Sequence, residues 1–215
     1  MKVVVTRPRR QARQLVERLE QLGHEVVECP LIEIEPIDPA KPVDASGYDW
    51  VVVTSPNGAE LFGLRRAGEL PKVAAVGPGT AEALRASGIE PALVPRVSTQ
   101  EGLLAELPRP PGRVLFAGAE GARRLLVDEL GADFLPLYRT VELTPPAPPE
   151  GDLVVLASAS AARAFAALGV STPAVSIGPQ TTRAAESAGV KILAEARTND
   201  LEGLIEAVEA CSSRS

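Results

Sequence analysis

The sequence contains few residues of the kinds that hold metal ions or form disulfides. It has a single histidine, His24, and two cysteines, Cys29 and Cys211, which lie far apart without a CxxC or zinc-ligand spacing. A transition-metal centre and a catalytic triad are therefore not expected, and we expect the protein to use no cofactor. His24 follows a glycine in a turn, and we expect its role to be structural. Two isolated cysteines are typical of a reducing compartment.

Long apolar runs and an excess of positive charge are also missing. No segment approaches the about 20 apolar residues that a membrane-spanning helix needs, and the N-terminus lacks the features of a secretory signal. We therefore expect a cytoplasmic protein without membrane contacts. The 22 basic residues are outnumbered by 28 acidic ones, and the net charge of -6 argues against nonspecific binding of nucleic acid.

What the chain does contain is self-similarity. Four pairs of segments match in register: 48–55 with 151–158, 73–80 with 174–181, 86–89 with 187–190 and 101–104 with 202–205. A fainter resemblance relates 2–28 to 113–137. The order along the chain is a short half, a long half, a short half and a long half. Duplication of an ancestral unit explains so many matches in register.

Within each half, short apolar runs alternate with segments of helical period. The apolar runs are continuous rather than alternating, as is typical of strands buried on both faces of a parallel sheet. Strand, helix and strand in repetition predict a doubly wound α/β fold, and ten strands predict two five-stranded, flavodoxin-like sheets. The predicted strands are 2–6, 25–28, 50–54, 73–76, 92–94, 113–117, 133–137, 152–157, 174–177 and 191–194.

Three proline-rich breaks separate the halves, at 35–42, 108–112 and 144–150. Tandem domains would use the middle break as their boundary, whereas nested domains would use the outer two. The segments 31–35 and 138–143 flank the outer breaks and alternate apolar with polar residues, so they could pair as a hinge between domains. The residues alone favour nesting only slightly.

Several short motifs resemble those of bacterial uroporphyrinogen-III synthases, the HemD-like family. They are Thr6-Arg7-Pro8, TSPNGA at 54–59, VGPGTA at 76–81, LYRT at 137–140 and IGPQT at 177–181. Each motif is unspecific, but their order and spacing together are specific, and the resemblance covers residues 2–208. One departure is Ala159, which stands between two serines where many relatives have a proline.

The resemblance implies a nested pair of similar five-stranded domains with the substrate in the cleft between them. Domain 1 would comprise 1–35 and 144–215, and the inserted domain 2 would comprise 40–138. Hinge strands at 31–39 and 138–144 would join them, and the protein would be a monomer.

The resemblance also implies the activity of a lyase of porphyrin biosynthesis. Such an enzyme closes hydroxymethylbilane, with inversion of ring D and loss of water, to give uroporphyrinogen III. The alternative is a non-catalytic HemD-like module that binds a tetrapyrrole or another anion and regulates something. A sensor of this kind would normally bring an effector domain. A two-lobed binding protein for a small solute is a third hypothesis, for which we would expect an export signal.

The substrate implied by the resemblance carries eight carboxylates, and doubly wound folds bind ligands at the carboxyl ends of their strands. The turns there open helices, whose N-termini carry about +0.5 charge and free N–H groups that receive carboxylates well. N-capping and turn geometry explain the same residues without a ligand. Substrate-binding residues predicted on these turns are Thr54, Ser55, Asn57, Gly77, Gly79, Thr80, Gly118, Ala119, Ser158, Ser160, Gly178 and Thr181.

Arginines are the second source of positive potential. Arg7, Arg9, Arg10 and Arg13 cluster at the start of the first predicted helix, where cations oppose the helix dipole. Anion binding and a solvated face both explain such a cluster. Arg7 is the strongest candidate because it lies in the turn itself, and Arg139 is a further predicted substrate-binding residue.

By resemblance, Tyr138 is the catalytic acid. A phenol with a pKa of about 10 is protonated at neutral pH and can donate a proton to the leaving hydroxyl group. The structural alternative is a half-buried hinge tyrosine without a chemical role. Holding the two ends of the substrate together could itself supply much of the rate.

Overall fold

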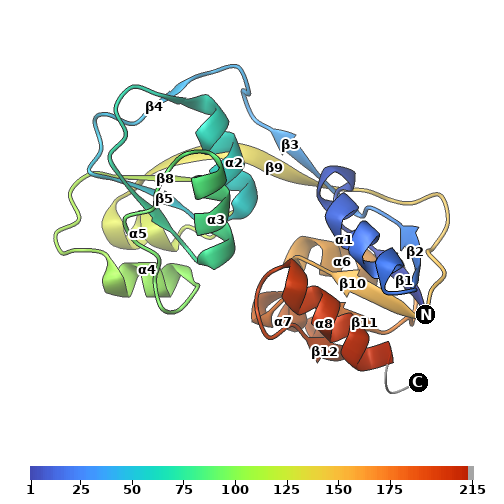
Figure 1. Ribbon diagram of the computed structural model, residues 1–215. Helices are drawn as coiled ribbons and strands as arrows, with labels where there is room; N and C mark the ends of the chain where they lie inside the picture. Colours follow the sequence, from blue (N-terminus) through green and yellow to red (C-terminus); the bar gives the residue numbers. More distant parts are fainter. Residues whose placement is uncertain (213–215) are drawn as a thin grey trace. The chain divides into compact units, whose positions relative to one another are not determined.

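The computed structural model describes residues 1–212. The chain divides into two compact units, of which unit 1 comprises Met1–Glu33 and Val141–Ser215, and unit 2 comprises Ile34–Thr140 (Figure 1). Residues 213–215, which the sequence assigns to domain 1, lie outside the described residues. In the described part, no helix is both long enough and apolar enough to cross a membrane.

Unit 1 is built on a five-stranded parallel sheet with the strand order β12-β11-β10-β1-β2. The strands are β1 (Lys2–Val5), β2 (Glu25–Glu28), β10 (Leu153–Leu156), β11 (Ala174–Ser176) and β12 (Ile192–Glu195). Helices α1 (Arg9–Gln21) and α8 (Leu201–Ser212) cover one face, and α6 (Ala159–Ala167) and α7 (Pro179–Ser187) cover the other. Residues of β1 point alternately into these two cores, Val3 and Val5 into one and Val4 into the other.

Unit 2 contains a second five-stranded sheet, with the order β3-β9-β8-β5-β7. Its strands are β3 (Ile32–Pro36), β5 (Trp50–Val53), β7 (Lys72–Ala75), β8 (Val114–Ala119) and β9 (Asp133–Glu142). A separate two-stranded sheet pairs β4 (Val43–Asp44) with β6 (Arg66–Ala67). The pairs β7–β5, β5–β8 and β8–β9 are parallel.

Helices again cover both faces of the unit 2 sheet (Figure 1). On one face lie α2 (Pro56–Arg65) and α3 (Pro78–Ala86), which pack on Val51, Val53 and Ala117 of the strands. On the other lie α4 (Gln100–Glu106) and α5 (Leu125–Leu130). The predicted α/β class with parallel sheets is confirmed.

One predicted strand is wrong. The segment 92–94 forms only an isolated bridge between Leu93 and Ala74, held by hydrogen bonds from Ala92 N to Val73 O and from Ala75 N to Leu93 O. Pro91 and Pro95 flank the segment, and proline cannot donate to a ladder, so the strand stops after one pair. The fifth strand of this sheet is instead β3, from the alternating segment before the first proline-rich break.

The boundary between the units falls inside two neighbouring strands, β3 and β9. Backbone hydrogen bonds from Ile37 N to Leu137 O (2.8 Å) and from Leu143 N to Leu31 O (2.9 Å) flank their pairing. Strand β9 continues without a break through the predicted strand 133–137 and into the segment from 138 onward.

Candidate functional site

The carboxyl edge of the unit 2 sheet places a buried tyrosine beside a serine. Tyr138 lies on β9, is only 5% exposed and packs in the core with Ala59 and Phe62 of α2. Its hydroxyl oxygen is 2.9 Å from Ser55 Oγ, which follows β5. Two of the predicted site residues, 83 positions apart in the sequence, are therefore in direct contact.

The route of the tyrosine side chain explains the small residues on β8. This strand lies between β9 and β5, so the phenol must cross it to reach Ser55, over two strand spacings of about 4.8 Å each. Leu115, Ala117 and Ala119 are the β8 residues that pack with the same core as Tyr138, and the two nearer the carboxyl end of the strand are alanines. A register shift between Gly118 and Ala119 sets Ala119 opposite Tyr138. Small side chains on β8 leave room for the ring.

Ser55 is also the N-cap of α2. Its backbone is extended, Pro56 occupies the first helical turn, and its Oγ accepts a hydrogen bond from Gly58 N at 3.0 Å. The capping alternative is therefore confirmed for this serine, and the contact with Tyr138 exists beside it. One side chain serves both the helix terminus and the tyrosine.

The environment of Tyr138 favours the protonated phenol. Burial raises the pKa of its hydroxyl, while the neighbouring side chains of Ser55 and Asn57 oppose that rise. Because the net direction is upward from an ordinary value of about 10, the phenol carries its proton at neutral pH. The chemistry available to this side chain at neutral pH is proton donation.

Two of the predicted glycines at this edge have packing reasons within unit 2. A Cβ added to Gly77 would lie 2.6 Å from Ser98 Oγ, and one added to Gly118 would lie 3.1 Å from the ring of Phe116 and 3.6 Å from Thr54 Oγ1. Gly77 has extended backbone and caps α3 without a side-chain bond. Thr80, in the first turn of α3, is buried.

The carboxyl edge of the unit 1 sheet presents an arginine. Thr6 is fully buried and donates from Oγ1 to Val155 O at 2.8 Å, which fixes the end of β1. The next residue, Arg7, is half-buried, and burial lowers the pKa of its guanidinium. Within residues 1–212 this guanidinium has no hydrogen-bond or ion-pair partner. It remains charged, because the pKa of arginine is too high for burial to neutralise it.

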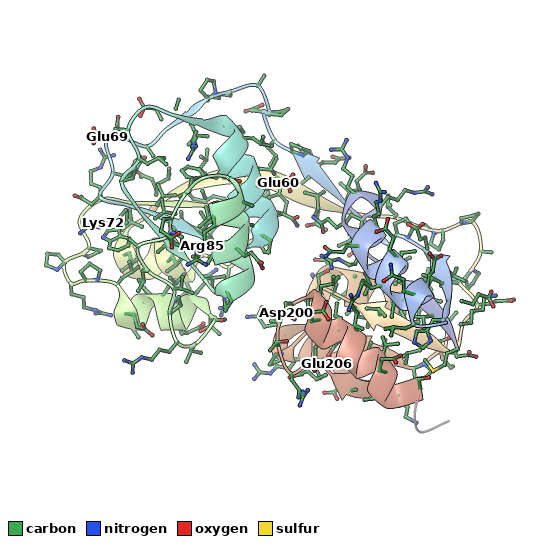
Figure 2. The ribbon with its side chains drawn as sticks, viewed as in Figure 1. Glu60, Glu69, Lys72, Arg85, Asp200 and Glu206 are labelled. Atoms are coloured by element: carbon green, nitrogen blue, oxygen red, sulfur yellow. The ribbon has the colours of Figure 1, made fainter. Side chains whose placement is uncertain are left out.

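Several polar and charged groups on or next to the helices of unit 1 have partners within that unit. Asp200 accepts a hydrogen bond from Gly203 N at 2.8 Å, and Glu206 accepts one from Arg197 at 2.7 Å (Figure 2 labels both carboxylates). Ser158 caps α6 by accepting from Ala161 N at 3.1 Å. Arg7 thus differs from Arg197 in having no carboxylate partner within the described residues 1–212.

The sequence matches a known family along most of its length. The model of the family described as "Uroporphyrinogen-III synthase HemD" matches residues 13–206. The chain belongs to this family.

Individual relatives agree with that assignment. The "Porphyrin biosynthesis protein HemD" of Ruminiclostridium josui is 33% identical over 160 residues, which are 65% of this chain but 32% of that protein. A protein of Methanocaldococcus jannaschii is 30% identical and is matched over 63% of its length. The chain thus spans less than two thirds of these two relatives. The uroporphyrinogen-III synthase of Synechococcus elongatus is 26% identical, with 96% of this chain and 94% of that protein covered.

Solved structures support the fold. A uroporphyrinogen III synthase from Thermus thermophilus matches with a TM-score of 0.68 at 18% identity, and all of both chains is covered. The enzyme from Helicobacter pylori matches with a TM-score of 0.63 at 16% identity, covering 98% of this chain and 99% of that one. At such low identity these likenesses show the fold alone.

The predicted site residues of this HemD family member fall at two sheet edges. At the unit 2 edge lie Thr54, Ser55, Asn57, Gly77, Gly79, Thr80, Gly118, Ala119, Tyr138 and Arg139; at the unit 1 edge lie Arg7, Ser158, Ser160, Gly178 and Thr181. Arg139 is exposed and 4.0 Å from Glu35. Thr181 is buried, and His24 lies at the opposite, amino end of β2, with its Nε2 2.6 Å from Glu209.

The sequence reasoning missed one polar chain in unit 1. Ser176, at the end of β11, lies 2.5 Å from Thr182 Oγ1, which also hydrogen-bonds to Glu195 of β12. These hydrogen bonds connect the first turn of α7 to the ends of two strands. Position at a strand end was the signal available, but Thr182 follows the turn motif by one residue. Among residues 1–212, no group of three His, Cys, Asp or Glu residues could hold a metal ion.

Proposed function

We propose that the chain catalyses the uroporphyrinogen-III synthase reaction, closing hydroxymethylbilane with inversion of ring D and loss of water. The observation that carries the proposal is the protonated, buried Tyr138 held by Ser55 at the carboxyl edge of a HemD-family sheet. Ligands of doubly wound folds bind at this edge, so the phenol lies where a substrate would arrive.

Tyr138 acts as the general acid. Its O–H proton passes to the terminal hydroxyl oxygen of the substrate, the C–O bond breaks with its electron pair on oxygen, and water leaves. The adjoining electron-rich pyrrole stabilises the carbocation that remains. The carbocation first bonds to the substituted α-carbon of ring D and gives a spiro intermediate. The older bond from that α-carbon to its methylene then breaks, and the methylene cation so formed bonds to the unsubstituted α-carbon, which inverts ring D. The proton lost from that last carbon restores the phenol. General acids of this kind contribute about 10²- to 10⁴-fold to a rate.

Groups that can bind carboxylates of the polyanionic substrate are present at each of the two sheet edges. Arg7 supplies a desolvated cation without a partner among the described residues, and such a group gains most from a carboxylate ligand. The helix starts supply N–H groups and partial positive charge. We propose as substrate-binding the remaining residues Thr54, Ser55, Asn57, Gly77, Gly79, Thr80, Gly118, Ala119, Arg139, Ser158, Ser160, Gly178 and Thr181.

We also propose that the protein is a monomer with nested domains. Domain 1 comprises 1–35 and 144–215, domain 2 comprises 40–138, and 31–39 with 138–144 are the hinge strands. The discontinuous unit 1 and the inserted unit 2 support this division, and so does the position of the unit boundary within β3 and β9.

The test is the isomer produced. Purified protein is incubated with hydroxymethylbilane, the products are oxidised to porphyrins, and the isomers are separated by chromatography. Type III product from the unsubstituted protein, and its loss in Tyr138→Phe, is the expected result. Only the type I isomer, which forms spontaneously, would exclude the enzyme and leave the regulatory module as the better hypothesis.

A further inference from the structure

The hydrogen-bond donors and acceptors around Ser55 limit the direction in which its hydroxyl proton can point. Within residues 1–212, Ser55 Oγ has two polar neighbours, Gly58 N at 3.0 Å and Tyr138 Oη at 2.9 Å. Gly58 N can only donate, so it takes a lone pair of Oγ. The single proton of the serine hydroxyl must therefore go elsewhere.

Two arrangements satisfy the 2.9 Å contact. If Tyr138 donated to Ser55, the serine proton would be left without an acceptor among the described residues, at a half-buried position where an unpaired donor is costly. If Ser55 donates to Tyr138, the serine proton is used and the phenol proton is not taken up by Ser55. In the second arrangement, the hydroxyls of both Ser55 and Tyr138 have hydrogen-bond partners once a substrate hydroxyl is present.

The terminus of α2 favours the same orientation. Ser55 caps a helix of 10 residues whose N-terminal end carries partial positive charge. Gly58 N donates to Ser55 Oγ, and Ser55 Oγ then donates to Tyr138 Oη. These two successive hydrogen bonds direct positive partial charge from the helix terminus toward the phenol oxygen. Negative charge that develops on that oxygen during proton transfer is therefore stabilised.

We propose that Ser55 is a positioning residue for the reaction: it donates a hydrogen bond to Tyr138 Oη, turns the phenol O–H toward the leaving hydroxyl and holds the phenolate that proton transfer produces. The inference rests on the proposed function. Tyr138 gives its proton to the departing oxygen, Ser55 keeps its own proton throughout, and the proton released on ring closure returns to Tyr138.

Charged groups do not provide an alternative explanation for this behaviour. The groups nearest along the chain and across the sheet are Arg139, which is exposed beside Glu35, and Glu120, whose backbone N donates to Tyr138 O. Burial, Ser55 and Asn57 are the influences on the phenol within the described part of the chain, and none of them carries charge.

The other unit supplies a matched control. Ser158 caps α6 as Ser55 caps α2, and Pro30-Leu31-Ile32 answers Pro136-Leu137-Tyr138 in sequence, so an isoleucine stands where unit 2 has the tyrosine. Ile32 packs in the same core as Ala161 and Ala162 of α6. Ser158→Ala removes an equivalent cap and touches no phenol.

The chain contains two tyrosines, so Tyr48→Phe leaves Tyr138 as the single titrating phenol. In this background, tyrosinate absorbance is followed against pH. Ser55→Ala is expected to raise the pKa of Tyr138 by about one unit or more, because a hydrogen bond to the charged form is lost. Ser158→Ala is expected to leave it unchanged, and Ser55→Thr, which keeps the hydroxyl, is expected to restore it.

Activity gives the second readout. Ser55→Ala is expected to lower kcat by about 10- to 100-fold, the range for a hydrogen bond to a charged group, with a smaller change in KM. Thr99→Ala removes another cap of unit 2, the bond from Gly102 N at 3.0 Å, and controls for loss of helix stability. Circular dichroism on each variant verifies folding.

The outcomes separate the two claims. Type III product from the unsubstituted protein together with an unchanged phenol pKa and kcat in Ser55→Ala would overturn this inference and leave the proposed function standing. Only type I product from the unsubstituted protein would overturn both, and the titration would still report whether Ser55 donates to the phenol.

Discussion

Substitution of Gly102 tests how closely the chain approaches the start of α4. A Cβ at this position would lie 2.0 Å from Val97 O, a backbone atom that cannot rotate away. Gly102 N also donates to Thr99 Oγ1, so the segment before the helix is held by a cap. Gly102→Ala must therefore displace the backbone around residues 97–99.

The size of the effect follows from three contributions. Alanine gains about 1 kcal/mol of helix propensity over glycine. Overpacking costs about 1–3 kcal/mol, and loss of the Thr99 cap costs about 1 kcal/mol. The net expectation is destabilisation of unit 2 by about 1–3 kcal/mol. Gly203→Ala, whose Cβ would lie 2.2 Å from Thr198 O, should behave alike in unit 1.

The assay is urea denaturation followed by circular dichroism. Gly121→Ala is the control, because a Cβ there meets nothing within 4 Å and its φ is not positive. If Gly102→Ala unfolded at the same urea concentration as Gly121→Ala and the unsubstituted protein, the clash would not exist and the described path of residues 97–102 would be wrong.

Three further predictions concern the sheet edges. Arg7→Gln is expected to raise KM for hydroxymethylbilane at least about tenfold with little change in kcat, measured by steady-state kinetics, since it removes binding and no chemistry; a lower kcat at unchanged KM would contradict this. The pKa of Tyr138 is raised in the folded protein, so the protonated phenol contributes to stability below about pH 10, and this contribution is lost as pH rises through the folded pKa. Above about pH 10, the free energy of unfolding should therefore fall more steeply with pH for the unsubstituted protein than for Tyr138→Phe, as measured by denaturation. Gly77→Ala should destabilise unit 2 through its clash with Ser98 Oγ, and Ser98→Gly in the same protein should recover most of the loss in thermal unfolding; no recovery would place the strain elsewhere.

Much of the sheet architecture could be predicted from apolar runs alone. Segments such as 50–54 and 152–157 are continuous because both faces of a parallel strand are buried, and Val51, Val52 and Val53 are all fully buried. The run 92–94 is also apolar, but the strand predicted from it was wrong, because the two prolines beside it limit it to a single bridge. Apolar composition indicates that a segment is buried. The length of the strand pairing depends instead on which residues have a backbone N–H group to donate.

The contact within the site could not be predicted, although both partners were named. Ser55 stands out as a cap and Tyr138 through its motif, but their meeting depends on the strand order β9-β8-β5 and on the shift between Gly118 and Ala119. A shift of one residue turns a side chain to the other face of a sheet. No local pattern in the sequence encodes that register.

The missing partner of Arg7 is a second feature that sequence cannot supply. Arg123 lies 2.8 and 3.0 Å from the two carboxylate oxygens of Glu101, and Arg197 pairs with Glu206. The pairing with Arg123 lowers the pKa of Glu101 to about 2. Which arginines have a carboxylate partner is decided by the tertiary placement of the acidic residues.

The duplicated sheets have therefore diverged at equivalent edges. Both keep a capping serine after a central strand, Ser55 in one unit and Ser158 in the other. Only unit 2 adds a phenol to its serine, and unit 1 places the cation Arg7, unpaired among residues 1–212, at the end of β1. A cation beside Tyr138 would lower its pKa and weaken its hold on the proton that the proposed chemistry requires at neutral pH. Under the proposed function, the edges of the duplicated sheets therefore have different tasks: the edge of unit 2 carries the general acid, and the edge of unit 1 carries an arginine that can bind an anion.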